Sequence, residues 1–516
     1  MMRLLLAPIL AMLMLTMAAA GQSLQEFQKR VSEFTLANGF HFIVVERHDA
    51  PVVAFNSYVN AGSVDDPAGQ TGIAHMFEHM AFKGTSAIGT TNWGIERQQL
   101  RDIEKAYDNF EEERNKGPRA DPQKLEQLLN RLKTEIELGE KYVNQNLFTR
   151  IIEANGGSGL NAQTTPDSTV FYYSLPSNRA ELWFLLESQR FYDPVFREFY
   201  KERDVVLEER RMSTESNPEG LLKETFTAAA FEAHPYHNPP GGWLSDISNF
   251  RLRDALAFYK KYYVPSNITF GIAGDINAAD ARRLAEKYFS IIPAGPAPPL
   301  IHTVEPKQLG ERKAVVESDS QPFELIGYKR PSERSPDDAV LEVIAGVLSG
   351  GRTGTIYKDL VRDKKVALSA GALATFPAGR YPNLFVFYVY PNLGKSLEEC
   401  EKPLSEAVER LKTEKVDDAT LKRIRAQLRA SLIGRLETNE SLASEVASYY
   451  ATYGDWRKLF TELQDYDKVT ADDVMRVAKQ YFVPEARTIA WIVPASGARP
   501  SGPASQQDQA ASPGVN

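Results

Sequence analysis

The stretch GIAHMFEHMAFKG, residues 72–84, places two histidines and a glutamate at a spacing that suits metal chemistry. On a helix, residues i and i+4 project from the same face, so His75 and His79 can both reach one ion. Glu78 lies close enough to contact a water on that ion. The chance expectation for this spacing in a chain with seven histidines is on the order of one percent. The alternative is a pair of helix-surface histidines without a metal.

A hydrolytic zinc site needs a third protein ligand and an open position for water. The other histidines show no comparable pairing: His41, His48, His234, His237 and His302. His234 and His237, which both lie in the stretch HPYHNPP, straddle a proline-containing turn, and this favours a loop role for them.

Acidic residues are better candidates for the third ligand. The stretch YKERDVVLEERRM, which begins at Tyr200, predicts a helix with Glu202 and Glu209 along one face. Glu208 points about 100° away and should face solvent. We therefore expect Glu209 to be the ligand and Glu202 to orient a ligating histidine, as such sites commonly require.

The chain contains an internal repeat. KKYYVPSNIT and KQYFVPEART share the order of lysine, tyrosine, an aromatic residue, valine and proline, and their prolines, Pro265 and Pro484, are 219 residues apart. A fainter match aligns Pro67 with Pro336, which are 269 residues apart. The first copy therefore holds about fifty extra residues between these landmarks.

Two domains are expected, at 27–295 and 300–495, joined by the proline-rich stretch IPAGPAPPLIH. The extra residues, at about 96–148, have apolar positions at helical spacing and are broken by KGPRADP. They predict a helical hairpin inserted into the first domain. It is either a solvated pair of helices or a part that shapes an entrance or docks a partner.

The second copy provides a comparison for the histidine motif. The residues aligned with the two histidines and the glutamate are apolar: Ile344, Val347 and Leu348. Buried polar groups without partners cost about 1 to 3 kcal/mol each, so a His/Glu/His face in place of an apolar one needs a compensating interaction. A bound metal would provide it.

Composition limits the other partners. The net charge of −8 gives no basic surface for nucleic acid or anionic lipid. Cys400 is the one cysteine, so the chain can form neither an internal disulfide nor a cysteine-based zinc site.

The composition of the N-terminal residues predicts export, and that of the C-terminal residues predicts a disordered tail. Residues 1–20, MMRLLLAPILAMLMLTMAAA, have the layout of a signal peptide cleaved after Ala20; the alternative of a membrane anchor is disfavoured because the apolar run is short and polar residues follow. The run is unlike an Arg- and Ser-rich transit peptide, so a bacterial periplasm fits better than a mitochondrion. Residues 496–516 are small and polar and predict a disordered tail.

Three ordered motifs resemble those of one family: HMFEH, GGSGLNAQTTPDSTVFYYSLP and ERDVVLEE. The inverted motif His-x-x-Glu-His is the inverzincin signature. Together the motifs resemble the insulinase-like zinc peptidases, which include pitrilysin and the mitochondrial processing peptidase. The resemblance covers 34–493 and implies an α+β fold, in which two homologous domains of mixed sheet plus helices face each other around a chamber.

The resemblance also implies a role for each candidate residue. One zinc ion per chain would be bound by His75, His79 and Glu209, and Glu202 would support the site. Glu78 would be the general base of a zinc-dependent endopeptidase, taking a proton from the attacking water and passing it to the leaving amine.

An extended substrate would add as a strand beside GLNAQT, where Asn161 and Ala162 match the family pattern; main-chain pairing makes little demand on peptide sequence. A simple turn and strand start is the alternative for this segment. Two other functions stay open: a catalytically silent structural or assembly subunit, and an exported peptide-binding protein.

One stretch departs from the family pattern. The family commonly carries an arginine in the second copy and, seven residues on, a tyrosine, and both reach the substrate. Arg362 is present here, but the tyrosine position holds Ser369, or Leu368 after a one-residue shift. In the family this pair also reaches the oxyanion that develops during the reaction. Losing a preorganised hydrogen-bond donor to that oxyanion lowers turnover by about 10²- to 10³-fold. We therefore expect a heterodimer whose homologous partner supplies this pair, with Arg362 positioning substrate or structure; alternatively Tyr357 or a nearby hydroxyl substitutes in a monomer or homodimer.

Overall fold

The computed structural model describes residues 27–494 and contains two compact units, each with its own sheet and hydrophobic core. Unit 1 comprises residues up to 207 together with 240–301 and 432–462, and unit 2 comprises 208–239, 302–431 and the residues from 463 onward. Mixed sheets and abundant helices confirm the predicted α+β class. The predicted signal peptide and tail lie outside the described residues.

Unit 1 is built on a six-stranded sheet in the order β1-β2-β6-β3-β5-β4. Its strands are β1 (Val31–Thr35), β2 (His41–Glu46), β3 (Val52–Val59), β4 (Ser158–Thr164), β5 (Thr169–Pro176) and β6 (Ile268–Gly274). β2 and β6 run parallel, and all other neighbours are antiparallel. β3 and β6 are buried along almost their whole length and are mostly apolar, although β3 also buries Asn56 and Ser57, whereas β4 is a partly exposed edge strand.

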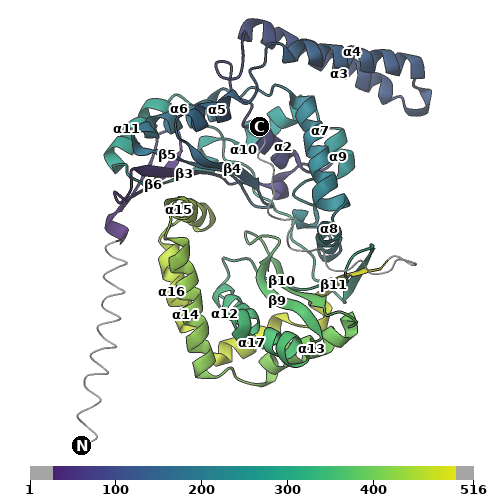
Figure 1. Cartoon of the computed structure of the whole chain (residues 1–516), viewed down its shortest axis with the longest axis vertical. Helices are drawn as coiled ribbons and strands as arrows, with labels where there is room; N and C mark the ends of the chain where they lie inside the picture. The colour runs from purple at the N-terminus through teal and green to yellow at the C-terminus, as the bar shows by residue number, and fades with distance from the viewer. Residues whose placement is uncertain (1–26, 495–516) are drawn as a thin grey trace, which may run out of the picture. The chain divides into compact units, whose positions relative to one another are not determined.

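Helices cover both faces of this sheet. The helices of unit 1, with the hairpin of α3 and α4 set apart from the sheet, are α2 (Ile73–Met80), α3 (Trp93–Arg114), α4 (Pro122–Glu140), α5 (Leu147–Ala154), α6 (Ala180–Tyr192), α7 (Phe199–Arg210), α9 (Leu244–Ser248), α10 (Leu252–Tyr262), α11 (Ala278–Phe289) and α15 (Asn439–Tyr453). Figure 1 shows α5, α6 and α11 on one side of the sheet and α15 on the other.

Unit 2 has a five-stranded sheet in the order β7-β11-β8-β10-β9. Its strands are β7 (Arg312–Glu317), β8 (Glu324–Arg330), β9 (Ala367–Phe376), β10 (Asn383–Pro391) and β11 (Arg487–Val493). Its helices are α8 (Pro218–Ala230), α12 (Asp338–Ser349), α13 (Leu397–Thr413), α14 (Asp418–Arg435), α16 (Lys458–Lys468) and α17 (Ala471–Tyr481). Boundaries between the units fall within α7, α14 and α16.

The two sheets repeat one topology. The order β2-β6-β3-β5-β4 in unit 1 corresponds strand for strand to β7-β11-β8-β10-β9 in unit 2, and each has one parallel pair at the same place. Pro265 and Pro484 each open a short 3₁₀ turn directly before β6 and β11. The repeat in the sequence is therefore a repeat of the fold.

Each sheet takes one covering helix from the other half of the chain. α15 packs on β2, β3 and β6, and a side chain at Gly271 would collide with the Ala443 carbonyl. α8 packs on β7, β8 and β11, where a side chain at Gly327 would collide with the Phe226 ring. The predicted boundary near 295–300 follows chain order, whereas the compact units exchange 208–239 and 432–462.

The predicted helical insertion is the hairpin of α3 and α4, which extends away from the rest of unit 1 (Figure 1). Asn92 caps α3 by accepting the Ile95 N–H, and Asp121 caps α4 ahead of Pro122 at the first helical position. These caps fix where each helix begins on either side of the KGPRADP turn.

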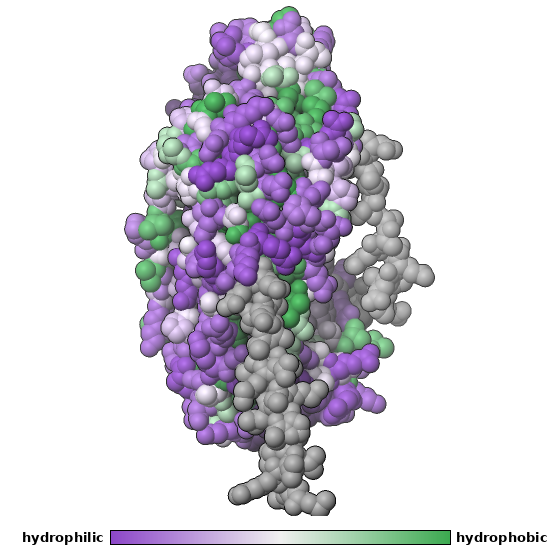
Figure 2. Space-filling view, turned by 90° about the vertical axis from the view of Figure 1, so that its left-hand side faces the viewer, coloured by the Kyte–Doolittle hydropathy of each residue, from purple (hydrophilic) through white to green (hydrophobic). Residues whose placement is uncertain are grey.

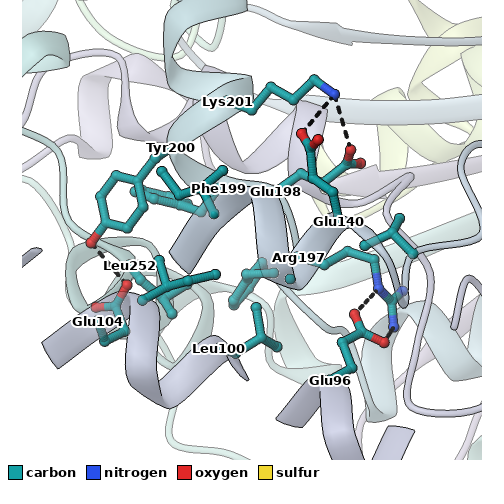
Figure 3. A pocket seen from close by; sticks show the side chains of 15 residues that line it. Glu96, Leu100, Glu104, Glu140, Arg197, Glu198, Phe199, Tyr200, Lys201 and Leu252 are labelled. Carbon is teal, nitrogen blue, oxygen red and sulfur yellow. Dashed lines mark hydrogen bonds and ion pairs between the residues drawn. The ribbon is translucent and has the colours of Figure 1, made fainter. Parts of the chain in front are cut away.

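A small cavity lies where the hairpin meets α7 (Figure 3). Arg197 Nε is 2.6 Å from Glu96 Oε1, and the Tyr200 hydroxyl donates to Glu104 Oε1 at 2.8 Å. Burial raises the pKa of Glu104 to about 7, although the Tyr200 hydrogen bond opposes the shift. The free space is about 30 Å³, enough for roughly one water, so these contacts bind the hairpin to α7 and to the residues just before it rather than enclose a ligand.

The surface is largely polar on the face drawn in Figure 2, where hydrophobic residues form small separate groups. Among residues 27–494, no helix combines the length and the apolar character needed to cross a membrane.

Glu324 in unit 2 should make stability fall with rising pH. Burial raises its pKa to about 9, and the facing Glu401 carboxylate adds to the shift, whereas an unfolded glutamate titrates near pH 4.3. Its stabilising contribution is therefore complete below about pH 4.3 and lost as the pH rises towards 9. We expect Glu324→Gln to raise the melting temperature by several degrees at pH 9 and by much less at pH 5, measured by calorimetry. Glu317→Gln, at an exposed strand end, is the control; equal effects of both would contradict the assignment.

Candidate metal centre

The histidine motif lies on α2, whose sequence divides into two faces. Ile73, Ala74, Met76, Phe77 and Met80 are buried in the core of unit 1. The two histidines and the glutamate are only partly buried and lie on the remaining face. The spacing of polar and apolar residues therefore aims all three chemical groups away from the core.

Asp66 fixes the beginning of α2. Its carboxylate accepts the N–H of Gly72 at 2.6 Å and that of Ala74 at 3.0 Å. Burial raises the pKa of Asp66 well above its usual value, although these two donors oppose the shift. Gly72 turns the chain into the helix with φ of 89°, which glycine adopts without strain. Sequence reasoning missed Asp66 because it lies seven residues before Ile73, the first residue of α2, rather than at the capping position.

The two imidazoles face each other. The Nε2 atoms of His75 and His79 are 3.3 Å apart, and the rings are nearly perpendicular. His79 Nδ1 lies 3.0 Å from Glu202 Oε1. Because a carboxylate only accepts hydrogen bonds, Nδ1 of His79 carries a hydrogen, and in the neutral imidazole Nε2 then presents a lone pair.

Glu209 joins this pair from the last turn of α7. One nitrogen from each histidine and one carboxylate oxygen of Glu209 lie within 4.8 Å of one another, and this is the one such group among residues 27–494. The boundary between the two compact units falls just before Glu208, within α7. Glu209 nevertheless belongs to the same unbroken helix as the residues of α7 that lie in unit 1. Glu208 points outward, where it is exposed and lies 3.3 Å from Arg211.

This donor set fits a zinc ion. Zinc in a tetrahedral site takes histidine nitrogen and carboxylate oxygen at about 2.0 to 2.2 Å, which places neighbouring ligand atoms about 3.4 Å apart. The Nε2 atoms of His75 and His79 match that separation. Three ligands from protein also leave a coordination position for water, as a hydrolytic site requires.

Glu202 is held on its far side by Lys83. The Lys83 ammonium is 2.6 Å from Glu202 Oε2 and 3.3 Å from Glu198. Burial alone would raise the pKa of Glu202, but the His79 hydrogen bond and the Lys83 charge outweigh burial and lower the pKa to about 2. Glu202 is therefore a carboxylate that can orient His79. Lys83 lies just after α2, and no spacing rule points to it in the sequence.

Glu78 contacts the edge strand of the sheet. The Thr164 hydroxyl donates to Glu78 Oε2 at 2.6 Å. Thr164 ends β4, the strand that also carries Asn161 and Ala162. β4 pairs with β5 on one side only, so its other edge is unpaired within the described sheet. The predicted substrate segment thus lies beside the predicted base, and Thr164 was not singled out in the sequence.

The remaining predicted residues lie in unit 2. Arg362 is exposed and pairs with its neighbour Asp363, at 2.6 Å between Nε and Oδ1. Ser369 and Leu368 are exposed on β9, and no tyrosine stands at either position. His234 is buried and accepts the N–H of Tyr236, so it caps a short turn as the loop role predicted.

Comparison with known proteins identifies the family. The protein-family model described as "Insulinase (Peptidase family M16)" matches residues 42–94 and 119–241. The family model described as "Peptidase M16 inactive domain" matches residues 249–428. The chain belongs to the insulinase family of peptidases. The unmatched stretch 95–118 contains most of α3, consistent with an insertion.

The relatives are named as proteases or peptidases, and one of them as a zinc protease. The zinc protease PqqE of Helicobacter pylori is 26% identical over 94% of this chain and 98% of its own length. A probable mitochondrial-processing peptidase subunit beta of Arabidopsis thaliana is 22% identical over 89% of this chain and 78% of its own length. The crystal structure of a protease from Helicobacter pylori matches 90% of this chain and 99% of its own, with a TM-score of 0.75 and 26% identity.

Metal content should separate the two neighbouring glutamates of α7. We expect one zinc per chain by elemental analysis, a sharp loss in Glu209→Gln, and almost no change in Glu208→Gln. Glu202→Gln should weaken zinc binding by about 10- to 100-fold, because Glu202 orients the ligand His79 but does not itself bind the metal. Equal zinc loss from both α7 variants would refute the assigned helix face.

Proposed function

We propose that this chain is a zinc-dependent endopeptidase that hydrolyses peptides or unfolded polypeptides. The observation that carries the proposal is the convergence of His75, His79 and Glu209, with Glu78 on the same helix face. The name of the Helicobacter pylori relative, a zinc protease, supports zinc-dependent proteolysis as the chemistry, and the Arabidopsis thaliana relative is named a peptidase.

Each residue then has a defined task. Zinc held by His75, His79 and Glu209 would supply Lewis acidity, which lowers the pKa of a water towards about 7 and polarises a peptide carbonyl. Glu202 keeps the hydrogen of His79 on Nδ1, so that Nε2 can act as a ligand. Glu78 accepts the proton of the attacking water and returns it to the leaving amine nitrogen.

The substrate would bind as an added strand on the open edge of β4, beside Asn161 and Ala162. Main-chain hydrogen bonds at such an edge bind extended peptides without demanding a particular sequence. Asn161 is exposed there, and its side-chain oxygen accepts the Ala162 N–H at 2.9 Å, which fixes the side chain along the strand.

We also propose a homologous partner and export. Arg362 is engaged by Asp363, and β9 offers no phenol at 368 or 369, so an arginine and tyrosine supplied by a second subunit would complete the site. The Arabidopsis thaliana relative is itself named as a subunit. Export, to a bacterial periplasm, is proposed from the composition of residues 1–20.

Glu78→Gln tests catalysis against binding. Removing the general base should lower peptide turnover by about 10²- to 10⁴-fold while zinc content and peptide binding persist. The assay is digestion of a mixed peptide library, with and without a chelator, followed by mass spectrometry. Glu153→Gln, at an exposed carboxylate on α5, is the control. Undiminished cleavage in Glu78→Gln, or no cleavage by the zinc-loaded chain under any condition, would favour a silent subunit or a peptide-binding protein.

The partner proposal requires the isolated chain. We expect fully zinc-loaded chain to turn over peptides slowly, and a homologous subunit carrying the arginine and tyrosine to raise turnover by about 10²- to 10³-fold. A homologous subunit with that tyrosine replaced by phenylalanine should give much less stimulation. Full activity of the chain by itself, unchanged by any partner, would exclude the heterodimer.

A further inference from the structure

β4 presents alternate side chains to α2. Leu160 and Ala162 are partly buried and pack against the core of unit 1, whereas Asn161 and Gln163 are exposed. Successive side chains on a strand point to opposite faces, so Thr164 shares the inward face with Leu160 and Ala162. This alternation delivers one hydroxyl to the carboxylate of Glu78, 86 residues away in the sequence.

The direction of this hydrogen bond is settled by chemistry. An ionised carboxylate only accepts, so the Thr164 hydroxyl donates its hydrogen to Glu78 Oε2. The hydroxyl of Thr169, 3.5 Å from that of Thr164, donates to the Ala61 carbonyl at 3.0 Å. The hydrogen of Thr169 is therefore used elsewhere, and the hydrogen of Thr164 is directed at the base.

We propose that Thr164 is the positioning residue of the general base. Its hydroxyl holds Oε2 of Glu78, so that Oε1 is the oxygen that exchanges the proton. A glutamate side chain has three rotatable bonds, and at 2.6 Å the bond to Thr164 has the length of a charge-assisted hydrogen bond, which fixes the carboxylate plane. This inference rests on the proposed function.

The proton balance leaves Thr164 unchanged. One proton leaves the attacking water, resides on Glu78 Oε1 and ends on the leaving amine nitrogen, while the Thr164 hydroxyl keeps its own hydrogen throughout. Thr164 therefore contributes by positioning Glu78. Proton transfer is fast only while the carboxylate oxygen stays close to the attacking water, and a carboxylate that is free to rotate spends less time in that position.

The same strand would thereby serve substrate and base together. β4 offers its open edge to the peptide backbone and its inward face to Glu78, so a peptide that orders β4 also orders the end of the strand that holds the base. The position of Thr164, two residues beyond Ala162 on one face, is what joins the two tasks.

Three variants test the role: Thr164→Val, Thr164→Ser and, as a control for the same exchange at an exposed hydroxyl, Thr134→Val on the hairpin. We expect Thr164→Val to lower kcat about 10- to 100-fold with KM within about twofold, since the base remains but loses its orientation. Zinc content and melting temperature should stay at the levels of the unmodified chain. Thr164→Ser, which keeps the hydroxyl, should restore most of kcat, and Thr134→Val should change nothing.

Crystal structures of the zinc-loaded variants provide a readout that needs no activity. The Glu78 carboxylate should occupy one position in the unmodified chain and in Thr164→Ser, and several in Thr164→Val. A single unchanged position in Thr164→Val, or a kcat equal to that of Thr164→Ser, would overturn the inference. If the unmodified chain cleaves no peptide, the proposed function fails, and these structures still decide whether Thr164 orients Glu78.

Discussion

The electrostatic cost of gathering two imidazoles and several carboxylates on one side of α2 is the constraint on which the rest of the site depends. His75 and His79 bring their Nε2 atoms to 3.3 Å, and Glu209 adds a carboxylate oxygen within 4.8 Å. Lone pairs and negative charge crowded in this way repel one another unless a cation or a shared hydrogen lies among them. The neighbouring contacts follow from that arrangement, because Lys83 neutralises Glu202 and Glu202 fixes a hydrogen on Nδ1 of His79.

Three separate elements of unit 1 must agree for this arrangement to exist. α2 carries both histidines and the base, α7 carries Glu202 and Glu209 two turns apart, and β4 carries Thr164 at the sheet edge. Asp66 sets the start of α2, and the Tyr200 to Glu104 contact ties α7 to the hairpin. Asp66, Tyr200 and Glu104 are not themselves candidate ligands, yet a shift in any of them would move a ligand side chain out of reach.

Periodic patterns in the sequence predicted the parts of the structure that depend on neighbours along the chain. The helical spacing of His75 and His79 and the outward direction of Glu208 followed from 3.6 residues per turn, and the repeat of the fold followed from the two proline motifs. Thr164, Lys83 and Asp66 escaped because their partners are chosen by packing between elements rather than by spacing. The exchange of α8 and α15 escaped for the same reason, since chain order carries no record of which sheet face a helix covers.

Comparison of the two copies shows how one fold supports both chemistry and packing. In α12, the counterpart of α2, Ile344, Val347 and Leu348 are buried in the core of unit 2, so the helix position itself demands no polar group. The chemistry of unit 1 is thus an addition to a scaffold that is stable without it. Each sheet of that scaffold depends on both halves of the chain. One face of the sheet of unit 1 is covered by α15 from the second half, and one face of the sheet of unit 2 is covered by α8 from the first half. A chain cut in the linker would leave each sheet with an apolar face uncovered unless the halves stayed together, so the half that carries the candidate ligands depends for its fold on the half that carries none of them.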